Sequence, residues 1–262
     1  NQHVAIHKAD NSMIANLMMY CRPELEGAHN RYWALIRHHF SEVGIDSPAH
    51  LSQEAEEFSV WEDPNLVLSQ TCGMPYRTRL QGKVTLIGTP DFGLEDCPRG
   101  YYRSAIVVHK NEPRQDLRTY KDAVFAYNQT ISQSGYAAPF NHLRPLGFWF
   151  ENRLHSQQHI LSAKAVATGQ ADIASLDAVT WRLICEYEDF ANQLRVLEWT
   201  EPTPSLPYIS AIGAEQEKVF GAVQKAIAQL SARDQKLLGL KGIIYIPAEE
   251  YLKVPNPDEV SS

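Results

Sequence analysis

Strand and helix signals alternate along this chain from one end to the other. Short apolar runs that predict strands lie at residues 13–19, 66–68, 84–88 and 104–109. Between the first two, residues 26–43 predict a helix with an apolar side formed by Tyr32, Leu35, Ile36 and Phe40. This alternation is the pattern of an α/β fold, because helices of this kind cover the faces of a sheet.

A second group of elements follows the polar segment 110–121. It consists of a strand at 123–127, a helix at 156–168 closed by Gly169, a strand at 171–176 and a helix at 178–187. This order predicts a small parallel sheet. Residues 194–210 are extended, residues 215–230 form an amphipathic helix, and the tail from Pro247 is expected at the surface.

The segments 110–121 and 194–210 are the expected crossings between two lobes. One discontinuous lobe then contains residues 1–115 plus 206–262, and the other contains residues 116–205. A chain of 262 residues is long enough for two such lobes. A cleft between α/β lobes is the expected binding site.

The composition excludes several classes of function. The formal net charge is -7, which argues against nucleic acid as a partner. Apolar runs stay well short of the roughly 18 residues that cross a bilayer, so no membrane insertion is expected. The first residues, NQHVAIHKADNSM, lack the pattern of a signal peptide, as would a chain whose signal had been cleaved. Periplasmic and cytoplasmic locations both stay open.

The cysteines do not predict a metal centre. Cys21, Cys72, Cys97 and Cys185 form no CxxC pair, so no metal site and no cofactor are expected. Cys72 and Cys97 are either a disulfide pair or separate buried thiols. Cys72 with His159 would be a nucleophile and a base, but no GxSxG, Walker, HExxH or GxGxxG motif is present. No catalytic residue is therefore expected.

The segment 123–136, AVFAYNQTISQSGY, is the strongest candidate for a binding site. An apolar strand runs into a polar loop with Ser132, Ser134 and Gly135, followed by a predicted helix. Free amides at a helix start, its dipole and serine hydroxyls together suit a phosphate, phosphonate or sulfonate. The competing interpretation is an ordinary serine cap.

Other polar residues stand at predicted strand ends or helix starts, where α/β proteins place ligand groups. They are Tyr20, Gln70, Thr71, Tyr136, His159 and Asp177. Each also has a structural interpretation: Asp177 as a helix cap, His159 as a solvated residue, and the tyrosines as packing groups.

The order of these segments resembles the PhnD-like family of phosphate/phosphonate substrate-binding proteins of ABC importers. The resemblance rests on residues 13–210, with the segments DPNLVLSQTCGMPY, LIGTPDFG, GYYRSAIVV, AYNQTISQSGY and HSQQHILSAKAVATGQADIASLDAVTW. It implies a two-lobed type II periplasmic-binding-protein fold with a mixed sheet in each lobe and a ligand cleft between them. It also implies a non-catalytic protein that binds a small tetrahedral anion and serves a membrane subunit in the periplasm.

By position, the resemblance implies that Ser132, Ser134, Gly135 and His159 hold the anion. Gln70, Thr71 and Asp177 would line the pocket, with Tyr20 and Tyr136 as walls. Gln133 stands where the family often has threonine, and Gln157 and Gln158 stand where it often has glycine. The alternatives are an enzyme on the same fold, like thiamine-pyrimidine or menaquinone-pathway proteins, and a ligand-sensing module.

Overall fold

The computed structural model describes residues 12–258, so the N-terminal segment 1–11 discussed above lies outside the described residues. The chain divides into two compact units. Unit 1 contains the residues up to Glu95 together with Pro204–Tyr251, and unit 2 contains Asp96–Thr203 with the residues from Leu252 onward.

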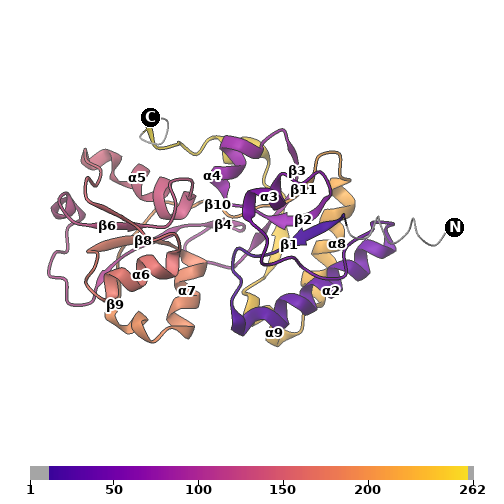
Figure 1. Ribbon diagram of the computed structural model, residues 1–262, viewed down its shortest axis with the longest axis horizontal. Helices are drawn as coiled ribbons and strands as arrows, with labels where there is room; N and C mark the ends of the chain where they lie inside the picture. Colours follow the sequence, from indigo (N-terminus) through magenta and orange to yellow (C-terminus); the bar gives the residue numbers. More distant parts are fainter. Residues whose placement is uncertain (1–11, 259–262) are drawn as a thin grey trace. The chain divides into compact units, whose positions relative to one another are not determined.

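Unit 1 is built on a mixed five-stranded sheet in the order β1-β2-β11-β3-β12 (Figure 1). Its strands are β1 (Ile14–Asn16), β2 (Leu66–Gln70), β3 (Val84–Asp91), β11 (Tyr208–Ala211) and β12 (Gly242–Ile244). β1 and β2 run parallel, whereas β11 is antiparallel to both β2 and β3.

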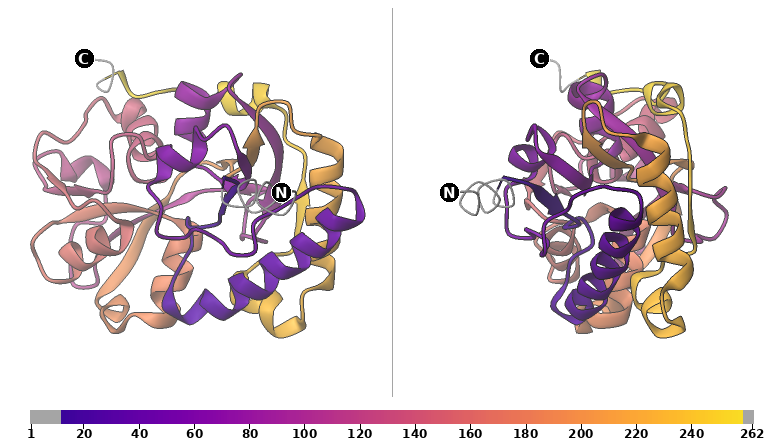
Figure 2. Two further views of the ribbon diagram at one scale, coloured as in Figure 1. Left: turned by 45° about the vertical axis from the view of Figure 1, so that its right-hand side comes forward. Right: turned by 90° about the vertical axis from the view of Figure 1, so that its right-hand side faces the viewer.

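Two long helices of unit 1, α2 (Glu26–Glu42) and α8 (Gln216–Gln229), lie side by side (Figures 1 and 2). The apolar side of α2 buries Tyr32, Ile36 and Phe40 to 1% exposure or less. The other helices are η1 (Pro23–Leu25), α3 (Glu57–Trp61), α4 (Gly73–Pro75), η2 (Tyr76–Leu80), α9 (Ala232–Leu238) and α10 (Ala248–Leu252).

Unit 2 contains a second mixed sheet, in the order β7-β6-β8-β5-β9. Its strands are β5 (Ser104–His109), β6 (Phe125–Tyr127), β7 (Arg153–His155), β8 (Ile173–Asp177) and β9 (Leu194–Trp199). β6 runs parallel to β7 and β8, whereas β5 runs antiparallel to β8 and β9. A two-stranded sheet joins β4 (Tyr101–Tyr102) to β10 (Thr203–Pro204).

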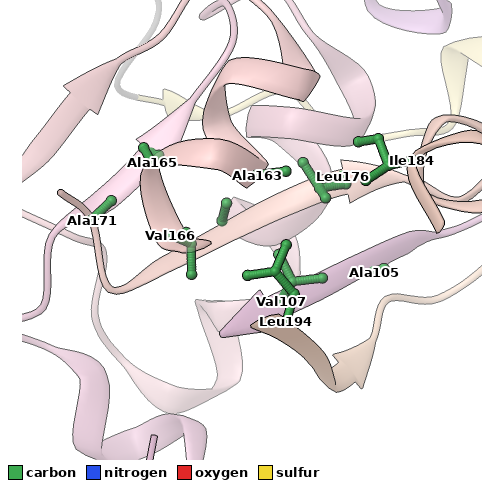
Figure 3. Close-up of a cluster of buried hydrophobic side chains, with 11 residues drawn as sticks. Ala105, Val107, Ala163, Ala165, Val166, Ala171, Leu176, Ile184 and Leu194 are labelled. Carbon is green, nitrogen blue, oxygen red and sulfur yellow. The ribbon is translucent and has the colours of Figure 1, made fainter. Parts of the chain in front are cut away.

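Helices flank the second sheet, and one of them packs through small side chains. In Figure 3, Ala163 and Val166 of α6 (His159–Ala167) lie over Val107 and Leu176 of the sheet. Alanine lets the helix approach the strands closely and positions its first residue, His159. The other helices are η3 (Leu117–Tyr120), η4 (Gln133–Ala137), α5 (Ala138–Leu143), η5 (Arg144–Leu146), α7 (Ala178–Tyr187) and η6 (Asp189–Gln193).

Most predicted elements are confirmed, with some differences in extent. The helices predicted at 26–43, 178–187 and 215–230 correspond to α2, α7 and α8 within one residue at each end. The first strand is shorter than predicted, because the Asn16 side chain accepts a hydrogen bond from the Met18 amide and turns the chain. The two strands predicted in the second group, β6 and β8, run parallel as expected. The complete sheet is mixed, as the resemblance implied, because β5 lies antiparallel beside β8 and β9.

The tail is not wholly at the surface. Tyr251 is only 1% exposed, and its hydroxyl donates to the Ser205 carbonyl at 2.7 Å. The division into units also differs from the expected lobes, because residues 96–115 and those from Leu252 onward belong to unit 2. β5 explains most of this difference, since both of its neighbours lie in the second sheet.

Within the described part of the chain, no helix is both long and apolar enough to span a membrane. None of the four cysteines forms a disulfide, so Cys72 and Cys97 are not paired with each other.

Candidate functional site

The loop after β6 folds into a serine-capped helical turn. Ser132 has extended backbone, and its Oγ accepts a hydrogen bond from the Gly135 amide at 3.0 Å. The Ala137 amide donates to the Ser132 carbonyl at 3.0 Å, which is the wide spacing of a π-helical turn. The first two amides of the helix, those of Gln133 and Ser134, have no intrahelical acceptor, because no turn precedes them. These donors and the positive end of the helix dipole suit an anion.

Two buried serines of the sheet hold this turn in place. The Ser134 carbonyl accepts a hydrogen bond from Ser104 Oγ on β5 at 2.9 Å and another from Ser175 Oγ on β8 at 2.7 Å. The sequence analysis did not single out either serine. In the sequence, each of them is a serine within an otherwise apolar strand. A hydroxyl buried in this way must find an acceptor.

His159 stands beside the same turn. Its Nε2 lies 3.0 Å from Ser134 Oγ and 3.4 Å from Asn128 Nδ2. Burial lowers the pKa of His159 to about 4, against a smaller opposing effect of the Ser175 backbone. The ring is therefore neutral at pH 7. Asn128 Nδ2 can only donate, so Nε2 of the neutral ring is an acceptor and the ring proton lies on Nδ1. The Ser134 hydroxyl donates to Nε2 in the free protein and can turn its proton to an anionic ligand.

Asn128, which the sequence analysis also missed, fixes Ser132. Its Nδ2 donates to Ser132 Oγ at 3.1 Å, and this oxygen also accepts from the Gly135 amide. Both lone pairs of the hydroxyl are thereby used, so its proton is left to donate outward. The sequence feature that could have identified Asn128 is an amide side chain directly after a predicted strand.

Gly135 is required by the position of Asn128. A Cβ added at Gly135 would lie 1.9 Å from Asn128 Oδ1 and 3.1 Å from His159 Cε1. The glycine therefore allows the turn, the asparagine and the histidine to come together.

Gln133 is the first residue of η4 and is 2% exposed. Both polar atoms of its side-chain amide are buried without a hydrogen-bond partner. Such groups are costly in a folded protein unless something else satisfies them. Gln133 thus offers a donor and an acceptor next to the free amides of the turn.

The other two predicted residues of unit 2 have structural roles. Asp177 caps α7, and its Oδ1 accepts from the Val179 amide at 2.7 Å. Tyr136 is 3% exposed, packs edge-on against Tyr127 and Trp149, and has Arg153 Nη1 3.0 Å from its hydroxyl. The structure brings Ser132, Ser134, Gly135 and His159 together, with Tyr136 and Asp177 beside them in the chain or sheet.

Three of the predicted site residues, Tyr20, Gln70 and Thr71, belong to unit 1. Gln70 Nε2 donates to the Leu206 carbonyl at 3.1 Å, and the Thr71 amide donates to the Pro207 carbonyl at 3.0 Å. Tyr20 is 8% exposed and packs edge-on against Phe92. Gln70 is the last residue of β2 and Thr71 follows it, and their role toward a ligand stays a prediction. Cys72 and His159 belong to different units.

Unit 2 also has an open hollow of about 600 Å³. It contains none of the predicted site residues. Its lining consists of Phe140, Trp149, Phe150, Glu151, Arg153 and Asp258.

The depressed pKa of His159 predicts a pH dependence of stability. An unfolded histidine takes up a proton near pH 6.5, whereas His159 in the folded chain does so only near pH 4. Between these values the unfolded state binds more protons, so the stability that wild type owes to a neutral His159 is lost as pH falls. His159→Gln should remove this loss, roughly 2–3 kcal/mol from the pKa difference. Urea unfolding of wild type and the variant at pH 7, 5.5 and 4.5 measures this loss. The same pH dependence of the free energy of unfolding in both proteins would contradict the prediction.

Solved structures share this fold at low sequence identity. XAC2383 from Xanthomonas citri bound to ATP aligns with a TM-score of 0.69 at 14% identity, over 93% of this chain and 95% of that one. PhnD1 from Prochlorococcus marinus in complex with methylphosphonate aligns with a TM-score of 0.68 at 15% identity, over 91% of this chain and 94% of that one. A binding protein component of an ABC phosphonate transporter, PA3383 from Pseudomonas aeruginosa, aligns with a TM-score of 0.64 at 15% identity, over 92% of this chain and 82% of that one. No curated protein sequence matches the chain.

Family comparison goes further than the fold. Residues 72–250, more than half of the chain, match the family described as "ABC transporter, phosphonate, periplasmic substrate-binding protein". Proteins of this family are generally periplasmic, bind small anionic solutes, work with membrane permease subunits and are not enzymes. The resemblance inferred from the sequence is thereby confirmed: the chain belongs to the family of phosphonate-type periplasmic substrate-binding proteins of ABC transporters.

Proposed function

We propose that this protein binds a small tetrahedral oxyanion of the phosphonate or phosphate class at the start of η4. The observation that carries the proposal is the group formed by Ser132, Ser134 and His159. It presents two backbone amides and two serine hydroxyls as donors, with a neutral imidazole behind one of them. Hydrogen bonds to a charged acceptor are about twice as strong as neutral ones.

Gln133 supports a ligand that carries both an acceptor and a proton. Its amide oxygen and nitrogen are buried and unpartnered, so each needs a complementary group. A singly protonated phosphonate or phosphate offers both kinds of atom, whereas sulfate and sulfonates offer acceptors only at neutral pH. We therefore expect phosphonate and phosphate to bind more tightly than their sulfur analogues.

Gln70 and Thr71, at the end of β2, are proposed as further ligand contacts, together with Tyr20, which packs on Phe92 after β3. Membership of the family supports a periplasmic location, which we propose for this protein.

A thermal-shift panel tests the proposed ligand class. The protein is unfolded in guanidinium, washed and refolded to remove any bound solute, then melted with methylphosphonate, phosphate, sulfate, methanesulfonate or acetate at equal ionic strength. A ligand at about 1,000 times its Kd stabilises the folded state by about 4 kcal/mol. Methylphosphonate or phosphate should therefore raise the melting temperature by several degrees. Equal small shifts with every anion would contradict the proposal.

A further inference from the structure

The last turn of α2 carries three metal-ligating side chains on one side. His38 Nε2 lies 3.1 Å from Glu42 Oε1, and His39 Nδ1 lies 2.9 Å from the same oxygen. The ligand atoms of all three residues lie within 4.8 Å of one another. The cluster belongs to unit 1 and is separate from the proposed anion site in unit 2.

The spacing fits a tetrahedral metal ion. Zinc binds imidazole nitrogen and carboxylate oxygen at about 2.0–2.2 Å, which separates neighbouring ligands of a tetrahedron by about 3.3–3.6 Å. The two distances to Glu42 are slightly shorter than this value, so small side-chain rotations would admit an ion. The side chains of His38 and Glu42 are 66% and 47% exposed, which gives an ion access and leaves room for water as a fourth ligand.

His39 is oriented for this role by α8. Its Nε2 lies 2.9 Å from Gln229 Oε1, an acceptor, so the ring proton of a neutral His39 belongs on Nε2. Nδ1 then presents a lone pair to the carboxylate oxygen of Glu42. Nδ1 is buried and makes no hydrogen bond, although it lies close to that oxygen. Two facing lone pairs repel each other, and a cation between them removes the repulsion.

The position on the helix also favours a cation. The C-terminal end of a helix carries partial negative charge from its unpaired carbonyls, and α2 ends at Glu42. Two imidazoles and a carboxylate are ligands that suit zinc and its neighbours in the transition series, whereas magnesium and calcium prefer oxygen alone. Cysteine spacing predicts no metal site in this sequence, and a His-His-x-x-Glu pattern needs a helix to bring its members together.

We propose that His38, His39 and Glu42 form a binding site for a divalent transition-metal ion, with zinc as the best fit. The site goes beyond the proposed anion-binding function and does not depend on it. Bound metal would join the end of α2 to α8 through His39 and Gln229.

Calorimetric titration of the chelator-treated protein with ZnCl₂ tests the site. We expect one zinc per chain at this cluster, and binding at least about tenfold weaker in His38→Ala and in Glu42→Gln, since even loss of a supporting group costs that much. His50→Ala, an exposed histidine of the same unit, is the matched control and should bind zinc like wild type. Magnesium should give no heat of binding.

Cobalt(II) provides a second readout, because a tetrahedral nitrogen and oxygen site gives it strong visible absorption. That absorption should appear in wild type and in His50→Ala and be lost in His38→Ala. Metal-free melting curves check that the variants fold, which the exposure of His38 favours. Unchanged zinc affinity in both cluster variants, or no zinc binding by wild type, would overturn the proposal.

Discussion

The double variant Ser134→Ala/His159→Ala should bind its anion at least about 100-fold more weakly than wild type. The substitutions remove the Ser134 hydroxyl and the imidazole 3.0 Å behind it. A hydrogen bond to a charged group contributes about 1.5–3 kcal/mol, and about 1.4 kcal/mol corresponds to tenfold in affinity. Loss of the Ser134 hydroxyl as a donor accounts for about a tenfold decrease in anion affinity. Loss of the His159 imidazole, which holds that hydroxyl, accounts for the rest.

Calorimetry with methylphosphonate, or with the anion that gives the largest thermal shift, measures the effect. His50→Ala/Ser52→Ala removes the same two side-chain types from exposed positions of unit 1 and should leave the affinity unchanged. The single variants separate the roles of the two residues. His159→Ala alone should weaken binding less than Ser134→Ala, because the histidine acts through the serine. Wild-type affinity in the double variant would show that the anion binds elsewhere.

The sequence predicted the members of this site because they lie at positions that the fold fixes locally. Ser132, Ser134 and Gly135 lie in the turn that follows β6, and His159 opens the helix that follows the parallel neighbour β7. Ends of neighbouring parallel strands meet at one edge of a sheet. Local patterns predicted β6 and the helix of His159 but not β7, so the grouping of these residues came from the resemblance.

The residues that sequence reasoning missed depend on long-range pairing. Ser104 supports the turn only because β5 lies antiparallel beside β8, and the apolar pattern of a buried strand does not reveal its partner. Asn128 and Gln133 were passed over for a different reason. Their importance comes from which atoms lack partners, and that depends on the packing around them.

Gln70 shows the limit of reasoning from residue type. Its position at a strand end was predicted, but its amide donates to the Leu206 carbonyl within unit 1. A polar side chain at a strand end either serves the fold or faces a ligand, and both uses look alike in sequence. Asp177, which caps α7, is a second example.

Gly135→Ala should strongly destabilise unit 2. Its new Cβ would lie 1.9 Å from Asn128 Oδ1, a separation that no packed structure keeps. Either Asn128 leaves, and Ser132 loses a hydrogen bond, or the turn shifts away from Ser104 and Ser175. Overpacking together with a broken buried hydrogen bond costs about 2–4 kcal/mol. Urea unfolding should show this loss, and anion affinity should fall at least tenfold with it.

A double-mutant cycle identifies the cause. Asn128→Ala removes the atoms that the new methyl group would meet, apart from His159 Cε1 at 3.1 Å, which needs only a small shift. Asn128→Ala alone should cost about 1 kcal/mol for its bond to Ser132. Adding Gly135→Ala to it should then cost little more, so the two effects are far from additive. Gly221→Ala on α8, where a Cβ meets nothing within 4 Å, is the control and should stabilise the protein by about 0.5–1 kcal/mol. Additive losses at residues 128 and 135 would mean that the glycine is needed for its backbone alone, and that Asn128 does not determine it.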